Sequence, residues 1–539
     1  MPKVLKDKII WDEDDWLAGL APQFISNTPL VIGNGASYQR NVNPFRKLGA
    51  IVPGFAPVNA TNEASITDIL VSGDTDYSGA TPYTYLVGGD KVQRLDISTD
   101  TISNTAPWPR TITHHATPAG KDLLIYNIIN AVTSVNSTVA LYSFSDATDG
   151  DVGMYDISSG ALNVFDDDFL STQPTGAFAL TTDEHPMILG DDGDVYIGNG
   201  ADLVKLKGDG GGNGTLSTAL TFPNGTIIHS FTKYPQYLII YASRSNISGS
   251  SYYRGNSVAY FWDYISNNFN NVYDLSDNLV TAGFNWNGIP GCFTYGRVSA
   301  GGSITTKLKL FNGSRFEQIQ EYVGNPPVGS GSVEIHDNMI VWNFGSASQS
   351  FIASYGSPWP GRVKNSLNYW GEGQGTGQSL SISGVCKNFS GVKLYVSTAS
   401  GANGGLQTFS ANYGPNSDGA SYFQAIQASL NLPSQSIGRI KSVKVHFRGI
   451  ATAGRAVRIV LQANYGSSAT HRVFEAFGTI TAGDTMKEYF KDTNDVEFPL
   501  FHTIAPVITW YTDTGGVDNT DAPAVRKIEI FYDIVKFNQ

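Results

Sequence analysis

Short apolar runs separated by polar turns recur along the chain and predict paired strands. In residues 85–102, YLVGGDKVQRLDISTDTI, two apolar runs flank GGD, and a polar DISTDT follows. Glycine-rich pairs between such runs are typical of β-hairpins. Sustained apolar spacing at i, i+3 and i+4 is hard to find, and glycine or proline interrupts almost every window of ~15 residues. The pattern therefore predicts an all-β protein.

The hairpin belongs to a unit that the chain repeats. In each unit a strand ends in Gly, Asn or Ser, a second strand carries an aromatic residue or Leu, and a polar turn leads into a third strand. The units are expected to start near Ser65, Thr113, Ala177, Thr226, Leu279, Ser332 and Gln378. Spacings of roughly 46–64 residues suit four-stranded blades with loop insertions. We therefore expect a β-propeller of about seven blades over residues 61–412; because the repeats are degenerate, six and eight stay open.

After residue 413 the strands lengthen and alternate cleanly. The alternation places three sets of residues each on one face of a strand: Val443, Val445 and Phe447; Val457, Ile459 and Leu461; and Ile528, Ile530, Tyr532 and Ile534. Period-two alternation is typical of strands with one buried face. Seven or eight such strands predict a β-sandwich of jelly-roll or immunoglobulin-like type over residues 413–539.

Residues 1–60 follow neither pattern and are interpreted as an extended N-terminal arm. They contain Trp11, Trp16, Phe24 and Phe45 but too little alternation for a core of their own. Leaving such aromatic side chains in water is unfavourable, so we expect the arm to order against another surface. A strand near residues 51–55 is expected to pair with residues 406–413 and close the propeller, and the more N-terminal part to lie on a neighbouring subunit.

Composition narrows the classes of function. The net charge is −12 and only 15% of the 539 residues are charged, which argues against a nucleic-acid groove. No uncharged apolar run reaches 18 residues, so no membrane span is expected. The opening MPKVLKDKIIWDEDDW has no apolar segment typical of a secretion signal, so we expect synthesis and folding in a reducing cytoplasm. Cys292 and Cys386 favour two buried free thiols over a disulfide.

Two acidic clusters have the residue types of a Ca²⁺ loop. They are Asp191, Asp192 and Asp194 in LGDDGDVYIG, and Asp146, Asp149 and Asp151 in SDATDGDVG. No glutamate closes the first loop at the twelfth position. Since Asp-Gly is a favoured hairpin turn, the turn interpretation is preferred for both clusters.

Other candidate chemistry is sparse. His114 and His115 are adjacent, and on a strand they would point to opposite faces, which predicts that they do not share a metal. No zinc-protease, nucleophile-elbow or phosphate-loop pattern is present. Trp262, Trp286 and Trp342 lie in strand-like runs and are expected to pack between blades. The sequence therefore predicts no catalytic residue, no cofactor, no metal site and no enzyme; a carboxylate pair contributed by distant blades stays open for glycoside hydrolysis.

Several stretches resemble tail-associated structural proteins of bacteriophage virions. They are KIIWDEDDWLAGLAP and NVNPFRKLGAIVPGFAP near the start; YLIIYASRS, VAYFWDYISNNF and LKLFNGSRFEQI in the middle; and KSVKVHFRG and PAVRKIEIFYDI near the end. The resemblance implies a propeller core with a terminal β-sandwich, of the type that forms hubs, nozzles or tail-tip rings. It implies no catalytic residue. WDYIS stands where the family has W-D-G, so we expect a longer turn after Trp262.

The leading hypothesis is a multi-copy structural protein of the virion tail, whose partners are other tail proteins and further copies in a homo-oligomeric ring. The alternative is a protein at the tail tip or capsid that binds a host surface glycan or receptor. Its ligand contacts would come from Tyr252, Tyr253 and Arg254 in the insertion SSYYRG. A propeller glycosidase is the third hypothesis.

Overall fold

The structure is a computed structural model and describes most of the propeller and the strands around it. The described residues are 3–5, 8–11, 36–40, 42–47, 50–53, 55–130, 135–157, 165–172, 179–207, 215–244, 255–296, 305–323, 326–346, 349–360, 365–372, 384–391, 393–400, 403–413, 421–425, 428–429, 436–449, 455–463, 471–476, 483–491, 495, 497–498, 500–501, 503–512 and 524–536.

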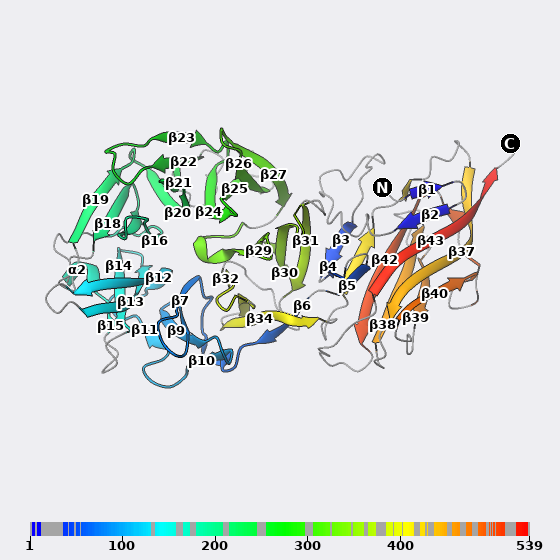
Figure 1. Ribbon diagram of the computed structural model, residues 1–539, viewed down its shortest axis with the longest axis horizontal. Coiled ribbons are helices and arrows are strands. Elements are labelled where there is room, and N and C mark those ends of the chain that lie inside the picture. Colours follow the sequence, from blue (N-terminus) through cyan, green and yellow to red (C-terminus); the bar gives the residue numbers. More distant parts are fainter. Residues whose placement is uncertain are drawn as a thin grey trace.

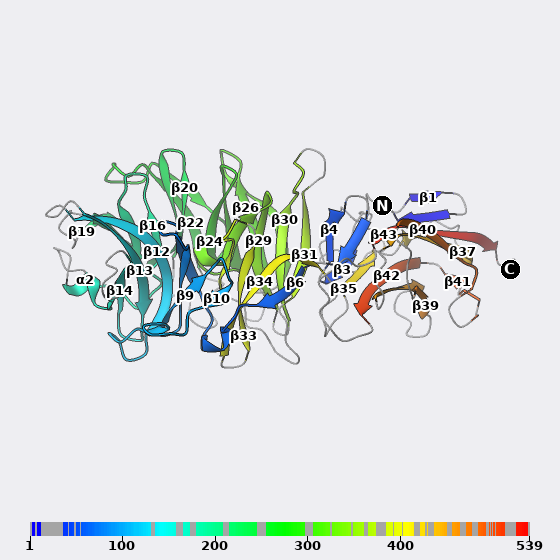
Figure 2. The same cartoon turned by 60° about the horizontal axis from the view of Figure 1, so that its bottom comes forward.

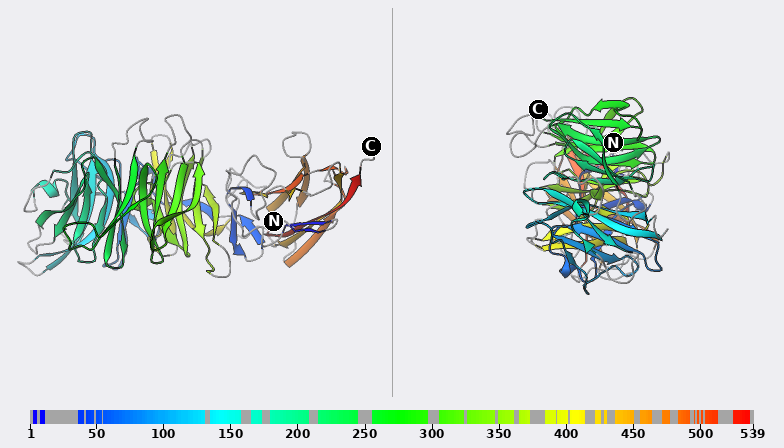
Figure 3. Two further views of the ribbon diagram at one scale, coloured as in Figure 1. Left: turned by 90° about the horizontal axis from the view of Figure 1, so that it is seen from above. Right: turned by 90° about the vertical axis from the view of Figure 1, so that its left-hand side faces the viewer.

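Nine antiparallel sheets make up the described part of the chain, and seven of them are the blades of a propeller. The other two form a sandwich that lies beside the propeller along the longest axis of the molecule (Figure 1, Figure 2). Both chain ends lie at the sandwich (Figure 3). The predicted all-β fold, a propeller followed by a β-sandwich, is confirmed. No helix among the described residues has the length and apolar character needed to cross a membrane.

Each blade is a sheet of at least four strands that follow one another in the chain, except in blade 7. Blade 1 contains β7 (Ser72–Asp76), β8 (Tyr83–Gly88), β9 (Lys91–Asp96), β10 (Thr101–Ile102) and β11 (Arg110–Thr111); blade 2 contains β12 (Ala119–Asn130), β13 (Val135–Ser145), β14 (Gly150–Asp156) and β15 (Phe165–Asp166); blade 3 contains β16 (Met187–Leu189), β17 (Val195–Asn199), β18 (Asp202–Lys207) and β19 (Thr215–Thr221); blade 4 contains β20 (Thr226–Tyr234), β21 (Tyr237–Arg244), β22 (Asn256–Trp262) and β23 (Asn271–Asp274).

The later blades are built in the same way. Blade 5 contains β24 (Leu279–Trp286), β25 (Ile289–Gly296), β26 (Thr305–Phe311) and β27 (Phe316–Val323); blade 6 contains β28 (Val333–His336), β29 (Met339–Ser346), β30 (Gln349–Gly356) and β31 (Ser366–Glu372); blade 7 contains β32 (Cys386–Lys387), β33 (Leu394–Ser400), β34 (Asn403–Tyr413) and β6 (Phe55–Asn59). The described helical pieces are η2 (Glu63–Ser65), α2 (Phe169–Thr172) and η4 (Ser330–Ser332).

The apolar runs seen in the sequence are the middle strands of the blades. All five residues of β17 are buried, because its two faces pack against two neighbouring blades. In the outer strand β19 only Leu216 and Leu220 are buried, as expected for a strand with one face exposed to solvent. The GGD of the first hairpin lies at the turn between β8 and β9, where Gly88 pairs with Lys91 and Gly89 has a φ of 52°. A left-handed turn residue of this kind suits the twist of a hairpin.

Buried apolar side chains form seven clusters in the propeller, and each cluster joins two neighbouring blades. One cluster joins blade 7 to blade 1 through Tyr395 and Leu86, so the ring of contacts is closed. Trp262, Trp286 and Trp342 are buried in these clusters, which confirms the predicted packing between blades. Cys292 and Cys386 are also buried there as free thiols, as expected.

The strand that closes the propeller comes from the N-terminal side of the chain. In blade 7, β6 pairs antiparallel with β34, so that Asn59 lies opposite Gln407 and Phe55 opposite Tyr413. The predicted closure of the propeller by an N-terminal strand is confirmed, but the closing strand is residues 55–59 and not residues 51–55. Ile51 pairs instead with Val525 in the sandwich.

The sandwich has the strand order of a jelly roll. One sheet contains β1 (Lys3–Leu5), β2 (Lys8–Trp11), β43 (Ala524–Lys536), β37 (Ser436–Gly449) and β40 (Gly483–Tyr489), with β4 (Val42–Lys47), β5 (Ala50–Pro53) and β41 (Leu500–Phe501) at its sides; the other contains β3 (Ala36–Arg40), β35 (Ser421–Ala425), β42 (Thr503–Thr512), β38 (Arg455–Ala463) and β39 (His471–Ala476), with β36 (Ala428–Ser429) beside β42. The four-strand orders β2-β43-β37-β40 and β35-β42-β38-β39, with the chain crossing between them, distinguish a jelly roll from an immunoglobulin-like sandwich.

The two sheets enclose one apolar core. Val443, Val445 and Phe447 are buried in it as predicted, together with Ile528 and Tyr532 of the last strand. Ile534 is an exception, because it lies near the end of β43 and is 41% exposed.

The N-terminal residues correct one prediction. The described strands of residues 1–60 belong to this chain's own sheets, whereas their N-terminal part was expected on a neighbouring subunit. In particular, Trp11 is fully buried in the jelly-roll core, where β2 pairs with β43. The physical reason is that β43 offers an unpaired edge and an apolar face, which the short apolar strand of residues 8–11 covers. Trp16 and Phe24 lie outside the described residues, and of Phe45 only its position in β4 is described.

Candidate functional site

The acidic loop of residues 191–194 is a hairpin turn tied down by lysines. Gly193 has a φ of 85°. Lys205 Nζ lies 2.9 Å from Asp192 and 2.7 Å from Asp194, and Lys233 pairs with Asp191 at 3.0 Å. Because ammonium groups already neutralise the carboxylates, the turn interpretation is confirmed. The predicted ligand loop, Tyr252, Tyr253 and Arg254, lies outside the described residues.

A pocket of about 410 Å³ lies among the innermost strands of several blades. Its lining comes from the starts of blades 1 to 3, from β20 of blade 4 and from the segment before blade 6. The polar residues of this axial pocket include Asp68, Lys121, Asp122, Glu184, His185, His229 and Ser330. Such a volume is within the usual range for small-molecule sites.

Asp122 occupies the buried side of the axial pocket. Its carboxylate accepts hydrogen bonds from the Ser72 hydroxyl and from the backbone N–H groups of Leu123 and Met187. Burial nevertheless dominates and raises the pKa of Asp122 to about 6. The Asp122 carboxylate of blade 2 therefore connects blades 1, 2 and 3, since Ser72 is the first strand residue of blade 1 and Met187 that of blade 3.

His229 and Glu184 form a second polar pair in the axial pocket. His229 Nδ1 lies 3.0 Å from the Glu184 carboxylate, and His229 Nε2 is buried without a hydrogen-bond partner in the described structure. Burial opposes ionisation of Glu184, but the hydrogen bond and charge of His229 outweigh it and lower the pKa of the carboxyl. Burial lowers the pKa of His185, although its ring nitrogens lie 2.8 Å and 3.1 Å from backbone carbonyls.

The sequence did not reveal the axial pocket. Its polar residues lie shortly before a blade's innermost strand or within it, such as His185 before MIL and His229 inside TIIHSF. In a propeller the innermost strands face the axis, so aligning the repeated units on these strands would have brought the polar positions together. The degenerate repeats obscured that alignment.

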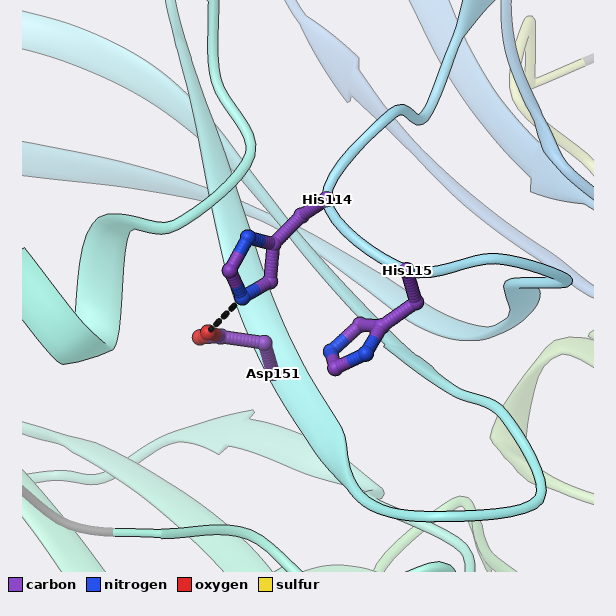
Figure 4. Close-up of side chains that lie close together, drawn as sticks. All are labelled: His114, His115 and Asp151. Carbon is purple, nitrogen blue, oxygen red and sulfur yellow. Dashed lines mark ion pairs between the residues drawn. The ribbon is translucent and has the colours of Figure 1, made fainter.

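A second polar group lies where the chain passes from blade 1 to blade 2. The prediction that His114 and His115 point to opposite faces is wrong, because they lie in a bend between β11 and β12 and not on a strand. Their rings are in edge-to-face contact, with centroids 4.5 Å apart. Figure 4 shows both rings beside Asp151. We name the following residues the His–Asp cluster: His114, His115, Asp146, Asp149, Asp151 and Asp168.

The carboxylates of the His–Asp cluster approach both imidazoles. His114 Nε2 lies 3.4 Å from Asp151 Oδ2 and 3.3 Å from Asp168 Oδ1. His115 Nδ1 lies 3.0 Å from Asp149 Oδ1 and 3.6 Å from Asp146 Oδ2. The residues come from the bend, from the β13–β14 turn, from β14 and from the segment after β15.

Asp146 and Asp151 also shape the chain around the cluster. Backbone N–H groups of Thr148 and Asp149 donate to Asp146, which lowers the pKa of that carboxyl. Asp151 accepts from the Val152 N–H at 2.7 Å, and its side chain is only 4% exposed. The sequence prediction of a turn in residues 146–151 is therefore confirmed, but the turn also brings carboxylates to the histidines.

Comparisons with known proteins bear on the fold alone. No protein-family model and no curated protein matches the chain. Among solved structures, the chain is similar to the propeller of Dos1 (11% identity, TM-score 0.38, 66% of this chain and 94% of that one) and to YCF48 bound to D1 peptide (10%, 0.39, 66% and 95%). It is also similar to Drosophila Plexin A in complex with Semaphorin 1b (9%, 0.37, 69% and 88%). The seven blades of the described chain place it in the class of β-propeller proteins.

Proposed function

We propose that the chain is a structural protein of a bacteriophage tail, present in several copies around the tail axis and acting through protein–protein contacts. The observation that carries the proposal is that one N-terminal segment completes both parts of the molecule. Residues 8–11 add a strand to the jelly roll, and residues 55–59 close the propeller. The chain therefore passes between the two parts twice, once before β6 and once after β34.

Two covalent crossings restrict the motion of the propeller relative to the jelly roll. Two strands that precede the first crossing also touch the propeller, because β3 and β4 lie against β31 of blade 6. Rigid two-part units suit load-bearing rings, in which each copy must hold a fixed orientation. The stretches that resemble phage tail proteins lie at the start, in the middle and at the end of the chain, and they support the same assignment.

The buried polar groups of the propeller are used to join blades, which also supports a structural role. The pairs that bond across blade boundaries include Asp74 with the Ile125 N–H, Asp122 with the Met187 N–H, Ser230 with the Gly283 N–H, Asn343 with the Gly384 carbonyl, and Ser397 with the Leu70 N–H. Each such bond satisfies a group that would be costly to bury alone.

The proposal is tested on purified particles of the virus whose genome encodes the chain. Quantitative mass spectrometry should find several copies per particle, at a fixed ratio to the other tail proteins. A replication protein of the same virus is the control for carry-over. If the chain is synthesised during infection but is no more abundant in particles than the replication protein, the structural role is wrong.

The axial pocket favours one alternative function, the binding of a small polar group such as a sugar of a host surface glycan. Titration of the purified protein with host polysaccharide fragments, followed by NMR, separates the two functions. Binding that His229→Gln abolishes would favour the alternative. Release of reducing ends from the polysaccharide would instead favour the glycosidase hypothesis.

A further inference from the structure

The His–Asp cluster has the spacing of metal ligands. One ligand atom of each of His114, His115 and Asp151 lies within 4.8 Å of the other two. Zinc bonds to nitrogen and oxygen are about 2.0–2.2 Å long, so ligand atoms on a tetrahedron lie roughly 3.3–3.6 Å apart. The distances from His114 Nε2 to Asp151 and Asp168, 3.4 Å and 3.3 Å, have the length of such edges.

His115 supplies an independent observation. Its Nδ1 lies 3.0 Å from Asp149 Oδ1, so the N–H at this nitrogen donates to a carboxylate. In that tautomer Nε2 carries a lone pair, and this atom is buried without a hydrogen-bond partner in the described structure. A carboxylate behind one ring nitrogen and an available lone pair on the other is the usual environment of a metal-binding histidine.

The third residue is already held in position. Asp151 Oδ1 accepts the Val152 N–H, and its Oδ2 faces His114. The Asp151 side chain is almost fully buried. Its Oδ2 therefore has a fixed position from which it can bind an ion that His114 also binds.

We infer that His114, His115 and Asp151 bind a zinc-type divalent cation. Two imidazoles and carboxylates suit Zn²⁺ and its neighbours among the transition metals, whereas Ca²⁺ and Mg²⁺ prefer oxygen ligands alone. Nothing in the site requires chemistry of the metal beyond ligation.

The location indicates a structural role for the ion. His114 and His115 belong to the connection from blade 1 to blade 2, and Asp151 belongs to β14 of blade 2. A shared ion would fasten the connection to the blade that follows it. The site goes beyond the proposed function, because the propeller could assemble into a tail with or without the ion.

The test uses the full-length protein after treatment with a chelator. Calorimetric titration with Zn²⁺ alone should give one ion per chain, and Co²⁺ should produce the visible absorption bands of a four-coordinate site. His114→Gln and Asp151→Asn should each weaken Zn²⁺ binding by roughly tenfold or more. His446→Gln is the matched control, because His446 lies 3.1 Å from a carboxylate of Glu529 in the jelly roll and is remote from the cluster.

The other outcomes overturn the inference. If wild-type protein binds no Zn²⁺, the cluster is a set of histidine–carboxylate ion pairs only. If His114→Gln and Asp151→Asn both bind as wild type does, the ion is adventitious. Loss of binding in Asp149→Asn with full binding in His114→Gln would place the ion on His115, Asp146 and Asp149 instead. Circular dichroism verifies the fold of each variant; should a variant not fold, the wild-type stoichiometry and Co²⁺ spectrum decide.

Discussion

Replacing Trp11 by Ala should destabilise the jelly roll, although the residue is more than 400 positions away from most of that domain. Trp11 is fully buried, lies opposite Ile528 in the β2–β43 pair and packs in the core shared by both sheets. Large-to-small changes at a buried tryptophan cost about 3–5 kcal/mol. With a typical guanidinium m-value of a few kcal/mol per molar, the midpoint of the jelly-roll transition should fall by about 1 M.

Trp11→Phe should cost clearly less than Trp11→Ala. The indole Nε1 is buried without a hydrogen-bond partner in the described structure, so Phe removes an unsatisfied donor while keeping most of the apolar volume. Trp342→Ala is the matched control, because Trp342 is equally buried but belongs to the cluster between blades 5 and 6.

Hydrogen exchange measured by mass spectrometry assigns each effect to a domain. Trp11→Ala should speed exchange in peptides of β37 and β43 and leave those of β25 and β29 near wild type, and Trp342→Ala should give the reverse. If Trp11→Ala changes neither the denaturation midpoint nor exchange in β43, residues 8–11 do not complete the jelly roll in solution and the reasoning fails.

Three further predictions concern buried polar groups. Burial raises the pKa of Asp122 from 3.8 to about 6, so the folded state holds an extra proton between these pH values. Propeller stability should therefore fall by about 2 kcal/mol as pH rises from 4 to 7. Thermal melts of Ser72→Ala, which removes a donor to the carboxylate, should show a larger fall. Burial also opposes ionisation of Glu529, but its hydrogen bonds with Lys527, Lys8 and His446 outweigh burial and hold the pKa at about 2, below the ordinary 4.5. The stability of the jelly roll should therefore fall as pH drops from 4.5 towards 2. Acid titrations of Glu529→Gln should lack this part of the loss. Asn343→Ala removes the hydrogen bonds that the side-chain amide donates to the Gly384 and Val385 carbonyls. Urea unfolding of the propeller should show a loss of about 1–3 kcal/mol in stability. An unchanged midpoint would show that this link between blades 6 and 7 contributes nothing to stability.

The sequence predicted the parts of the fold that local patterns determine. Middle strands that are buried on both faces have continuous apolar runs in the sequence, as in YLIIYASR of β21. Sandwich strands with one buried face have alternating apolar and polar residues, as in β37. Blade boundaries followed from the repetition of these runs. The turn at Asp191 to Asp194 was predictable because Asp-Gly has a backbone preference of its own.

Pairing between distant segments could not be predicted in the same way. The strand β2 has only four residues, too few for a period to show, and nothing near Trp11 in the chain indicates that its partner begins at Ala524. The choice between a jelly roll and an immunoglobulin-like sandwich depends on the same long-range pairing. The His–Asp cluster was missed because His114 and His115 were assumed to lie on a strand, and a bend lets neighbouring side chains face one way.

Electron cryomicroscopy of intact virus particles, with symmetry averaging of the tail, tests the proposed function most directly. A structural role in the tail predicts repeated copies of a seven-bladed propeller joined to a jelly roll, arranged as a ring around the tail axis with the two parts in one fixed orientation. Density for the chain only at a distal, radially exposed position would favour receptor or glycan binding, and a tail without such density would contradict the proposal.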